Sequence, residues 1–440
     1  MERRGVVFWF VLWLIGSLFW LSQDVLIRDG DEEGHVGAAE LFVQILSEQG
    51  FWAWGKEFLW GNYGEYPPLF AALLGGWWFI WGGQPHILGV RTFGLLFIVA
   101  GAVCTELWSQ KKEGVPGLAF LVVLLSPLFN GIGRHFMIEI PLVFFSALLG
   151  LGCSINGPRG NVLGGVALGF GLLCKQTFLI AVLPMLFWGL QVRRWLMVLI
   201  AAGIAGPWYF AQIGAQRSYL AQSWGGEDVN WLMHLLSPLS MMGWDLLGPI
   251  FTVVFLAALF KRRALKPEIF WVFAALVIFA IIPKKYPRLL LGLLPYIAVL
   301  IAVELKFWSV FQRQGVLAAS ALWLTLGSVF TLPVNILRKK TDDSCPQIWL
   351  RPVGDDLGLR KAAQWIEEVN VGPVYVLEEG IPCELQTTHP FSYHLKLYLN
   401  RRGFEHEIVS VASEEDITLA TMVIKWSPQG VELIRTSQSK

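Results

Sequence analysis

Residues 28–35 read Arg-Asp-Gly-Asp-Glu-Glu-Gly-His and follow directly on the apolar run 6–27. That run is long enough to cross a bilayer, which takes about 20 apolar residues. The acidic stretch therefore leaves a membrane-length helix in a loop that still lies close to the bilayer. Ionised groups beside hydrocarbon are costly and are usually kept for function. We expect the chain to be organised around this loop, with Asp31 and Glu32 at its centre.

The composition is that of a polytopic membrane protein. Of the 440 residues, 55% are apolar and only 15% are charged, which is unlike a soluble enzyme. Trp occurs 22 times, which suits membrane interfaces and also the flat faces of sugar rings. The net charge of +1 gives no indication of a nucleic-acid partner. No A-x-A-like cleavage site follows the run 6–27, so we expect a retained helix rather than a signal peptide.

Apolar runs near membrane length recur through the first three quarters of the chain. The candidate spans are 6–27, 88–108, 116–133, 140–155, 162–174, 177–190, 195–212, 246–260, 268–282, 288–303 and 315–337. The run 69–83 is left out because it is short, contains Gly75-Gly76 and is bracketed by prolines and glycines. The sequence therefore predicts a polytopic α-helical fold with about eleven crossings.

Charge placement sets the expected orientation. Arg3 and Arg4 place the N-terminus in the cytoplasm by the positive-inside rule. If 69–83 does not cross, every cytoplasmic loop is basic, whereas a crossing there would turn all these loops outward. We therefore expect 69–83 to be a juxtamembrane or re-entrant helix in a first outer loop, 28–87. The predicted location is the inner (plasma) membrane, with the C-terminus outside.

The composition becomes polar after Arg338. We predict helices at 359–369 and 393–402 and strands at 373–378 and 421–426, from their apolar periodicity. The sequence thus divides into a membrane domain, 1–337, and a small extracytoplasmic α/β domain, 338–440. Cys345 and Cys383 lie in the second domain and could pair in an oxidising compartment.

In this topology, charged side chains from several segments meet on the outer face. They are Asp31, Glu32, Glu33, His35, Glu65, Arg134, His135, Glu139, Lys175, Glu227, Asp228, His234, Lys284, Lys285 and Arg288. Cations at this level go against the positive-inside rule, and an anionic ligand such as a lipid-linked phosphate would account for them. The alternatives are general contact with lipid headgroups and an error in the topology.

The acidic candidates each have a chemical use and an ordinary alternative. A carboxylate of Asp31 or Glu32 could act as a base or hold a metal ion; otherwise it is a solvated loop charge. Pro67-Pro68 would hold Glu65 and Tyr66 rigidly at the start of a helix.

The remaining candidates are cations and histidines. Arg134 and Glu139 bracket an apolar turn at the outer end of a predicted span. The ordinary alternative to a functional role is a local salt bridge or a pair of snorkelling side chains. His35, His135 and His234 could bind a metal or orient a substrate, although a lone His is more often structural.

Taken together, these residues resemble the GT-C superfamily of integral-membrane glycosyltransferases. The likeness is to the branch that holds the protein O-mannosyltransferases and the bacterial lipid A aminoarabinose transferase, and it covers roughly residues 5–305. In chain order the pattern is Asp31-Glu32, Glu65-Tyr66-Pro67-Pro68-Leu69, Gly89-Val90-Arg91, Arg134, Glu139-x-Pro141, Gly165-x-x-x-Gly169 followed by Lys175, Pro207-Trp208-Tyr209, and Lys285-x-x-Arg288 with Pro295. Each piece is weak, but their order and spacing make the combination specific.

The resemblance implies a polyprenyl-phosphate sugar donor of the undecaprenyl type and an extracytoplasmic acceptor such as a lipid, glycan or protein. It implies that Asp31, Glu32 and Glu139 are the catalytic carboxylates. It further implies that the donor phosphate is bound by Glu65, Tyr66, Arg134, Lys175, Lys285 and Arg288. A divalent metal is a possible cofactor, with Glu65 and His234 as its candidate ligands.

Two positions depart from the family pattern. Tyr66 stands where the family has a basic residue, which puts one phosphate contact in doubt, and Glu139 stands where Asp is usual. The expectation is a hexosyl- or pentosyltransferase. The rival interpretations are a transporter or flippase of lipid-linked sugars and a non-catalytic membrane subunit. Transporters often carry internal repeats and helices broken near the midplane, whereas here the charges gather at one face.

Overall fold

The computed structural model describes residues 3–23, 30–61, 66–82, 88–191, 194–214, 217, 231–260, 266–282, 287–329, 359–369, 374–378, 395, 399, 408–411, 422–427 and 430–434. The chain forms two compact units. The first takes in Met1–Leu21, Gly34–Lys339 and Gln347–Arg351. The second takes in Ser22–Glu33, Lys340–Pro346 and Pro352–Lys440. The predicted domain division at residue 337 stays a prediction.

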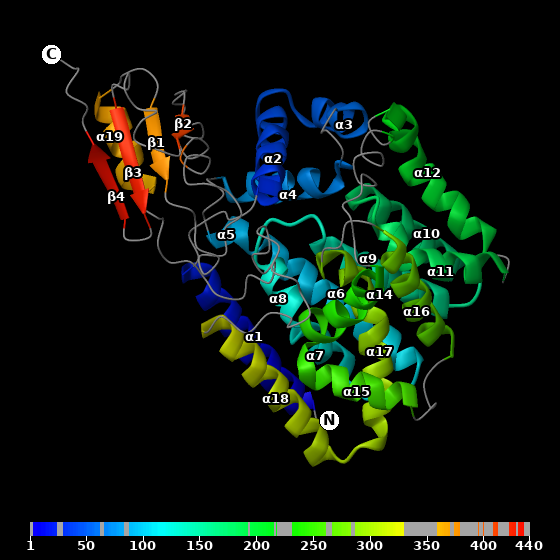
Figure 1. The fold of residues 1–440 in the computed structure, drawn as a ribbon. Coiled ribbons are helices and arrows are strands. Elements are labelled where there is room, and N and C mark those ends of the chain that lie inside the picture. Colours follow the sequence, from blue (N-terminus) through cyan, green and yellow to red (C-terminus); the bar gives the residue numbers. More distant parts are fainter. Residues whose placement is uncertain are drawn as a thin grey trace. The chain divides into compact units, whose positions relative to one another are not determined.

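The first unit is helical (Figure 1). Its helices are α1 (Arg3–Gln23), α2 (Gly30–Glu48, from its second turn), α3 (Phe51–Trp60), α4 (Leu69–Trp81), α5 (Leu88–Arg91), α6 (Phe93–Lys111), α7 (Leu118–Leu124), α8 (Pro127–Gly133), α9 (Ile140–Ser154), α10 (Pro158–Cys174), α11 (Phe178–Gln191), α12 (Trp195–Ala211), α14 (Trp231–Ser240), η1 (Met241–Leu246), α15 (Gly248–Phe260), α16 (Lys266–Ile281), η2 (Pro287–Leu293), α17 (Leu294–Glu304), η3 (Leu305–Phe307) and α18 (Val310–Val329).

Glycines allow the central helices of this unit to pack closely. Helix α9 packs against α6 on one side and α10 on the other, and α10 packs against α12. A Cβ atom at Gly165 would lie 2.7 Å from the Met197 carbonyl oxygen, and one at Gly169 would lie 2.8 Å from Ile204. The Gly165-x-x-x-Gly169 motif therefore brings α10 against α12, as small residues do between membrane helices.

The polytopic helical fold class is confirmed. By length and apolar composition, three described helices could cross a membrane, namely Arg4–Gln23, Leu88–Lys111 and Pro287–Phe307. The segments Leu236–Leu246 and Gly248–Phe260 could together form one more span, bent by 119°. Further apolar helices of 10–17 residues are Leu69–Trp81, Ile140–Ser154, Phe178–Phe187, Trp195–Ala211 and Pro267–Ile281. The expected number of crossings and their orientation stay predictions.

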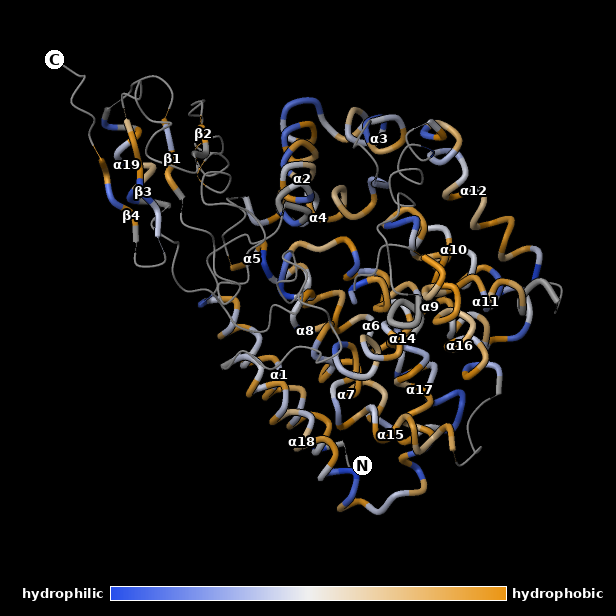
Figure 2. Tube along the Cα trace, in the orientation of Figure 1, coloured by the Kyte–Doolittle hydropathy of each residue, from blue (hydrophilic) through white to orange (hydrophobic). Residues whose placement is uncertain are grey.

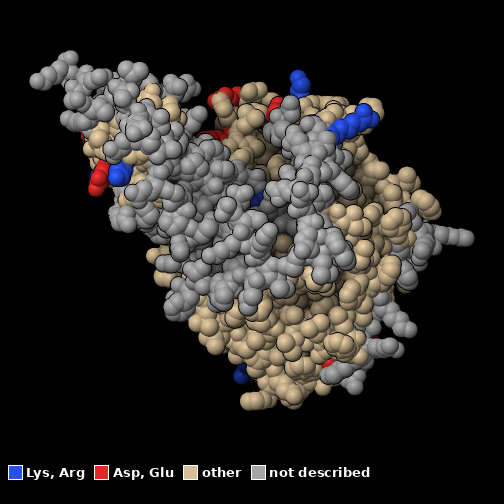
Figure 3. Space-filling model, viewed as in Figure 1, with Lys and Arg blue, Asp and Glu red and all other residues tan. Residues whose placement is uncertain are grey.

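The surface of the helical unit fits a lipid environment. Figure 2 shows long orange, apolar stretches along α1, α12, α16 and α18. On the face drawn in Figure 3, the described residues over these packed helices are mostly uncharged, and most of the visible charged side chains lie toward the margins. Large apolar side chains such as Phe210 and Phe260 point outward, with 84% and 83% of their surface exposed. Such exposure is costly in water and acceptable in lipid.

Two local expectations are wrong. The acidic stretch 28–35 does not continue as a loop, because α2 begins at Gly30 and acidic residues suit the first turn of a helix. The run 116–133 is two short helices, α7 and α8, with a break at Leu125-Ser126. There the Ser126 side chain caps α8 and also donates to the Leu246 carbonyl at 2.6 Å. The predicted run 246–260 agrees with α15, which begins at Gly248 directly after the π-helix η1 and Leu247.

The described residues of segment 28–87, which we predict to be the first outer loop, form helices α2, α3 and α4. Pro67-Pro68 directly precede α4, as the sequence predicts, and Gly82 ends it in the left-handed conformation with φ 57°. Helix α4 packs on α2 at Gly75, where a Cβ atom would lie 2.8 Å from the Ala39 carbonyl oxygen. Whether α4 enters the membrane stays a prediction.

The second unit contains helix α19 (Leu359–Val369) and a four-stranded sheet in the order β2-β1-β3-β4. The strands are β1 (Val374–Glu378), β2 (Ile408–Val411), β3 (Met422–Ser427) and β4 (Gly430–Ile434). Strand β1 is parallel to β2 and β3, and β3 is antiparallel to β4. Alternate residues Val374, Val376, Ile424 and Trp426 form a core with Ile366 of α19.

The predicted α/β character and two of the strands agree with this unit. Strands β2 and β4 were not predicted; both are short and lie at the edges of the sheet. Of the expected helix 393–402, only Leu395 and Leu399 are described, and both are buried. Cys345 and Cys383 lie outside the described residues.

Candidate functional site

A buried acid lies between two buried cations at the centre of the helical unit. The Lys175 Nζ atom lies 2.5 Å from Glu139 Oε1, and the Arg288 Nε atom lies 3.2 Å from the same oxygen. Glu139 has no exposed surface, and Lys175 and Arg288 are 3% and 7% exposed. Buried charges are usually found only where they are paired or bind a ligand. This group of three buried charges is therefore the candidate functional site.

The helix ends explain why this acid and this lysine meet. Glu139 directly precedes α9, whose first residues include Pro141, and Lys175 directly follows α10. A helix N-terminus stabilises a negative charge and a C-terminus a positive one. Because α9 and α10 pack side by side with a short connection, the start of one lies beside the end of the other. The packing of α9 against α10 therefore brings Glu139 and Lys175 together.

Arg288 reaches this point from a later segment, the 3-10 helix η2. Its position is fixed by the Ser146 hydroxyl of α9, which donates a hydrogen bond of 2.6 Å to the Gly292 carbonyl. Pro287 begins η2, and the neighbouring residues Leu290 and Leu291 are buried. The hydrogen bond from Ser146 and the buried apolar neighbours thus hold η2 in place, with Arg288 beside Glu139.

Two aromatic rings extend this group of charges, and all five residues are called the Glu139 cluster below. The Lys175 Nζ atom lies 5.2 Å from the centre of the Tyr66 ring, within cation–π range. The Tyr66 ring makes an edge contact with the His35 ring at 5.4 Å. His35 belongs to α2, is 6% exposed and also contacts the ring of Phe70 in α4 at 5.4 Å. The cluster therefore consists of His35, Tyr66, Glu139, Lys175 and Arg288.

The charge state of Glu139 follows from its neighbours. Burial raises the pKa of this carboxyl, but the charges of Lys175 and Arg288 outweigh burial and lower the pKa to about 2. Glu139 is therefore ionised at neutral pH. A carboxylate with so low a pKa is a poor base, and its geometry instead suits holding two cations in place.

Arg134 lies in a different environment. Its guanidinium group stacks over Trp20 of α1 at 5.2 Å, and its Nη2 atom donates to Ser17 at 3.3 Å and to Asn130 at 3.4 Å. His135 contacts Trp20 edge-on at 5.3 Å. These contacts join α1 to α8. Arg134 therefore has a structural role in addition to its predicted contact with a phosphate.

Several predicted site residues are described only in part or not at all. Asp31 lies in the first turn of α2, but its side chain is outside the described residues. Glu32 is fully buried. Glu65 and Lys285 lie outside the described residues, and His234 lies in α14 with its side chain outside them. The structure thus brings together Tyr66, Glu139, Lys175 and Arg288 from the predicted set.

His35 joins the cluster although sequence reasoning gave it little weight. The signal was present, because His35 comes four residues after Asp31, a spacing that places two side chains on one face of a helix. That signal depended on recognising that the acidic stretch begins a helix. As for a metal site, the described residues include no group of three His, Cys, Asp or Glu side chains placed to bind an ion.

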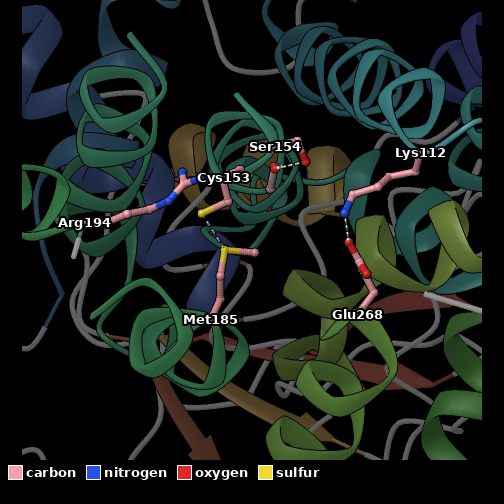
Figure 4. A network of polar contacts seen from close by, with 7 residues as sticks. Lys112, Cys153, Ser154, Met185, Arg194 and Glu268 are labelled. Carbon is pink, nitrogen blue, oxygen red and sulfur yellow. Dashed lines mark hydrogen bonds and ion pairs between the residues drawn. The ribbon is translucent and has the colours of Figure 1, made fainter. Parts of the chain in front are cut away.

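A second polar network lies at the other end of α9 (Figure 4). Arg194 donates hydrogen bonds to the carbonyls of Gly152 and Cys153 at 3.1 and 2.6 Å, which satisfies the last turn of α9. Nearby, Lys112 pairs with the buried Glu268 at 2.8 Å. The ends of a helix of this length lie about 20 Å apart, so this network is separate from the Glu139 cluster and ties helices together.

Comparison with known proteins identifies the fold. No protein-family model matches the chain, and no curated protein matches it. Two solved structures of ArnT from Cupriavidus metallidurans are similar. The structure bound to undecaprenyl phosphate has a TM-score of 0.60 and 15% identity over 98% of this chain and 94% of that one. The apo structure has a TM-score of 0.59 and 16% identity over 97% and 94%. The expected GT-C fold is therefore confirmed.

Proposed function

We propose that this chain, which has the GT-C fold, is a membrane glycosyltransferase that uses a polyprenyl-phosphate sugar donor. The observation that carries the proposal is the pair of buried cations, Lys175 and Arg288, held on one carboxylate of Glu139. Arg and Lys are the residues that bind phosphate groups in proteins. The similar ArnT structure contains undecaprenyl phosphate, which supports a donor of this class.

The proposed reaction is a single displacement at the anomeric carbon. The acceptor O–H or N–H gives its proton to a carboxylate, which we assign to Asp31, with Glu32 beside it. The acceptor atom forms a bond to the anomeric carbon as the bond from that carbon to the phosphate oxygen breaks. The phosphate leaves with the electron pair as a lipid phosphate monoester, and the configuration of the sugar inverts.

In this proposal Lys175 and Arg288 contribute more to stabilising the transition state than the base does. Negative charge grows on the leaving phosphate, and fixed positive charges in a site of low polarity stabilise that charge strongly. Glu139 acts as a positioning residue, since it holds Lys175 and Arg288 without competing as a base. Tyr66 contributes its ring face to Lys175 rather than the positive charge usual at this position. In this proposal Arg134 and Lys285 are additional phosphate contacts, and Glu65 and His234 are the candidate ligands of a divalent metal.

The test uses purified protein in lipid nanodiscs with undecaprenyl phosphate-linked sugars and a cell-envelope extract as acceptor. Mass spectrometry then follows the glycan product and the released undecaprenyl phosphate. We expect Lys175→Met and Arg288→Met to reduce transfer at least 100-fold, in line with the loss of one charge-stabilising group. The matched control is Lys306→Met, because Lys306 is an exposed lysine paired with the exposed Glu113 at 3.1 Å.

The outcomes separate the rival functions. Transfer that survives both substitutions would refute the assignment of these cations. Movement of a lipid-linked sugar across the nanodisc or a vesicle membrane without release of undecaprenyl phosphate would identify a flippase. Asp31→Asn at unchanged expression tests the base, and wild-type transfer by that variant would remove Asp31 from the mechanism.

A further inference from the structure

Helix η2, which carries Arg288, lies between two prolines. It begins at Pro287, and Pro295 stands in the first turn of α17, which follows directly at Leu294. All seven residues of η2 wind as a 3-10 helix. Such runs rarely exceed about four residues, because their hydrogen-bond geometry is poorer than that of an α-helix. A segment with this winding therefore needs contacts from other elements to hold it.

The Gly292 carbonyl cannot receive the hydrogen bond that a 3-10 helix would give it. In that winding each carbonyl accepts from the N–H group three residues later. The residue three after Gly292 is Pro295, which has no N–H group. The Ser146 hydroxyl of α9 donates to this carbonyl at 2.6 Å instead, and Ser146 has no exposed surface. A distant segment thus supplies the donor that the local sequence lacks.

Gly292 also packs closely against α11. A Cβ atom at Gly292 would lie 2.7 Å from the Cβ atom of Ala181. The neighbouring side chains of Leu291 and Leu293 are 0% and 1% exposed. The end of η2 that joins α17 is therefore held by both α9 and α11.

The winding of η2 decides where Arg288 lies relative to this fixed end. Arg288 precedes Gly292 by four residues. Successive residues turn by about 120° and rise about 2.0 Å in a 3-10 helix, against about 100° and 1.5 Å in an α-helix. Rewinding these four residues as an α-helix would turn Arg288 by about 80° around the axis and move it about 2 Å along the axis. These displacements are large enough to break the 3.2 Å contact between Arg288 Nε and Glu139 Oε1.

We propose that Ser146 is a positioning residue, whose hydrogen bond to Gly292 keeps η2 in the winding that directs Arg288 to the leaving phosphate. The proposal rests on the proposed function, because it needs Arg288 to bind that phosphate. Ser146 lies seven residues after Glu139, about 10 Å along α9, so it acts on the reaction through Arg288. Without the hydroxyl, the Gly292 carbonyl can accept from the N–H group of Tyr296, four residues later. That α-helical bond draws η2 away from its 3-10 winding.

The first test measures sugar transfer by Ser146→Ala in nanodiscs with the undecaprenyl phosphate-linked donor. We expect kcat/KM to fall at least tenfold per folded molecule, since misplacing a binding group by about 1 Å can cost about 100-fold. The matched control is Ser154→Ala, because the Ser154 hydroxyl donates at 3.0 Å to the Gly150 carbonyl within α9 itself. We expect this control to stay within about twofold of wild type.

Thermal unfolding reports whether Ser146→Ala is folded. If it is not, Ser146→Cys takes its place, because the thiol has nearly the same size and is a weaker donor than the hydroxyl. We expect kcat/KM of Ser146→Cys to fall at least threefold. Wild-type kcat/KM in the folded variant would overturn the role of Ser146.

Double variants separate positioning of Arg288 from a general weakening of the fold. We expect Arg288→Met to have an at least tenfold smaller effect on kcat/KM in the Ser146→Ala background than in wild-type protein. Lys175→Met should keep its full effect in both backgrounds. Equal effects of Arg288→Met in the two backgrounds would overturn the proposal. If wild-type protein transfers no sugar, or if Arg288→Met transfers as well as wild type, the proposed function itself fails, which is a different result.

Discussion

The pairing of Glu139 with Lys175 leads to a stability prediction that can be worked from the structure. Glu139→Gln removes the negative charge from a carboxylate with no exposed surface, yet it keeps nearly the same volume. Lys175 and Arg288 are then left as neighbouring buried cations. Breaking a buried ion pair from one side costs ~3–5 kcal/mol. We expect Glu139→Gln to lower the free energy of unfolding by this amount.

A double-mutant cycle separates the pair from other effects of the substitution. Lys175→Met alone leaves Glu139 with Arg288 as its remaining partner in the cluster, and Glu139→Gln with Lys175→Met removes the repulsion between the two cations. We therefore expect the double variant to be more stable than the sum of the single effects by ~1–3 kcal/mol. The assay is equilibrium unfolding in mixed detergent micelles, followed by Trp fluorescence.

The matched control is Glu113→Gln. Glu113 forms the same kind of pair with Lys306 at 3.1 Å, but the two side chains are 83% and 47% exposed. Exposed pairs contribute less than ~1 kcal/mol. Additive effects of Glu139→Gln and Lys175→Met, or equal costs for Glu139→Gln and Glu113→Gln, would refute the view that the buried trio is a coupled electrostatic unit.

Three further predictions concern the charge of Glu139, the packing at Gly94 and the end of α9. The pKa of Glu139 is lowered to about 2 from 4.5, so its ionised form stabilises the fold fully above pH 4.5. The difference in unfolding free energy between wild type and Glu139→Gln should therefore be constant from pH 8 to 5 and shrink as the pH falls toward 2. Unfolding titrations at each pH measure this difference. Gly94→Ala should lower the free energy of unfolding by more than ~3 kcal/mol, because the new Cβ atom would overlap the Gly133 carbonyl oxygen. The control Gly16→Ala should be nearly neutral, because a Cβ atom there has nothing within 4 Å. Thermal unfolding of both variants checks this, and equal melting temperatures would contradict the packing. Arg194→Met should cost ~1–3 kcal/mol by leaving the last carbonyls of α9 without their charged donor, while transfer per folded molecule stays unchanged; a loss of turnover in the folded variant would place this end of α9 in the mechanism.

Local sequence information was sufficient for most of the helices. The apolar runs 140–155 and 195–212 correspond closely to α9 and α12. An apolar segment in a membrane must satisfy its backbone hydrogen bonds internally, and a helix does so. The amphipathic pattern of 359–369 and the β-branched run at 421–426 likewise determined α19 and β3. In these segments the backbone hydrogen bonds close within the element or with an adjacent strand, so nearby residues decide the outcome.

Elsewhere the tertiary structure decided what the local pattern left open. The run 116–133 reads as one helix by its apolar content, although Ser126 and Pro127 mark the start of α8; the tertiary structure adds the bond from Ser126 to the Leu246 carbonyl. Similarly, the meeting of His35 and Tyr66 depends on α2 packing against α4. Spacing along the chain carries no information about such contacts.

The Glu139 cluster shows both contributions. The sequence by itself determined a membrane protein with helices in order, acidic and basic residues at helix ends, and the resemblance to the GT-C superfamily. Only the tertiary structure decided that Lys175 and Arg288 share one carboxylate oxygen and that His35 stands beside them. The physical reason is that a charge in an apolar interior is stable only with a partner, and the fold supplies that partner from distant segments.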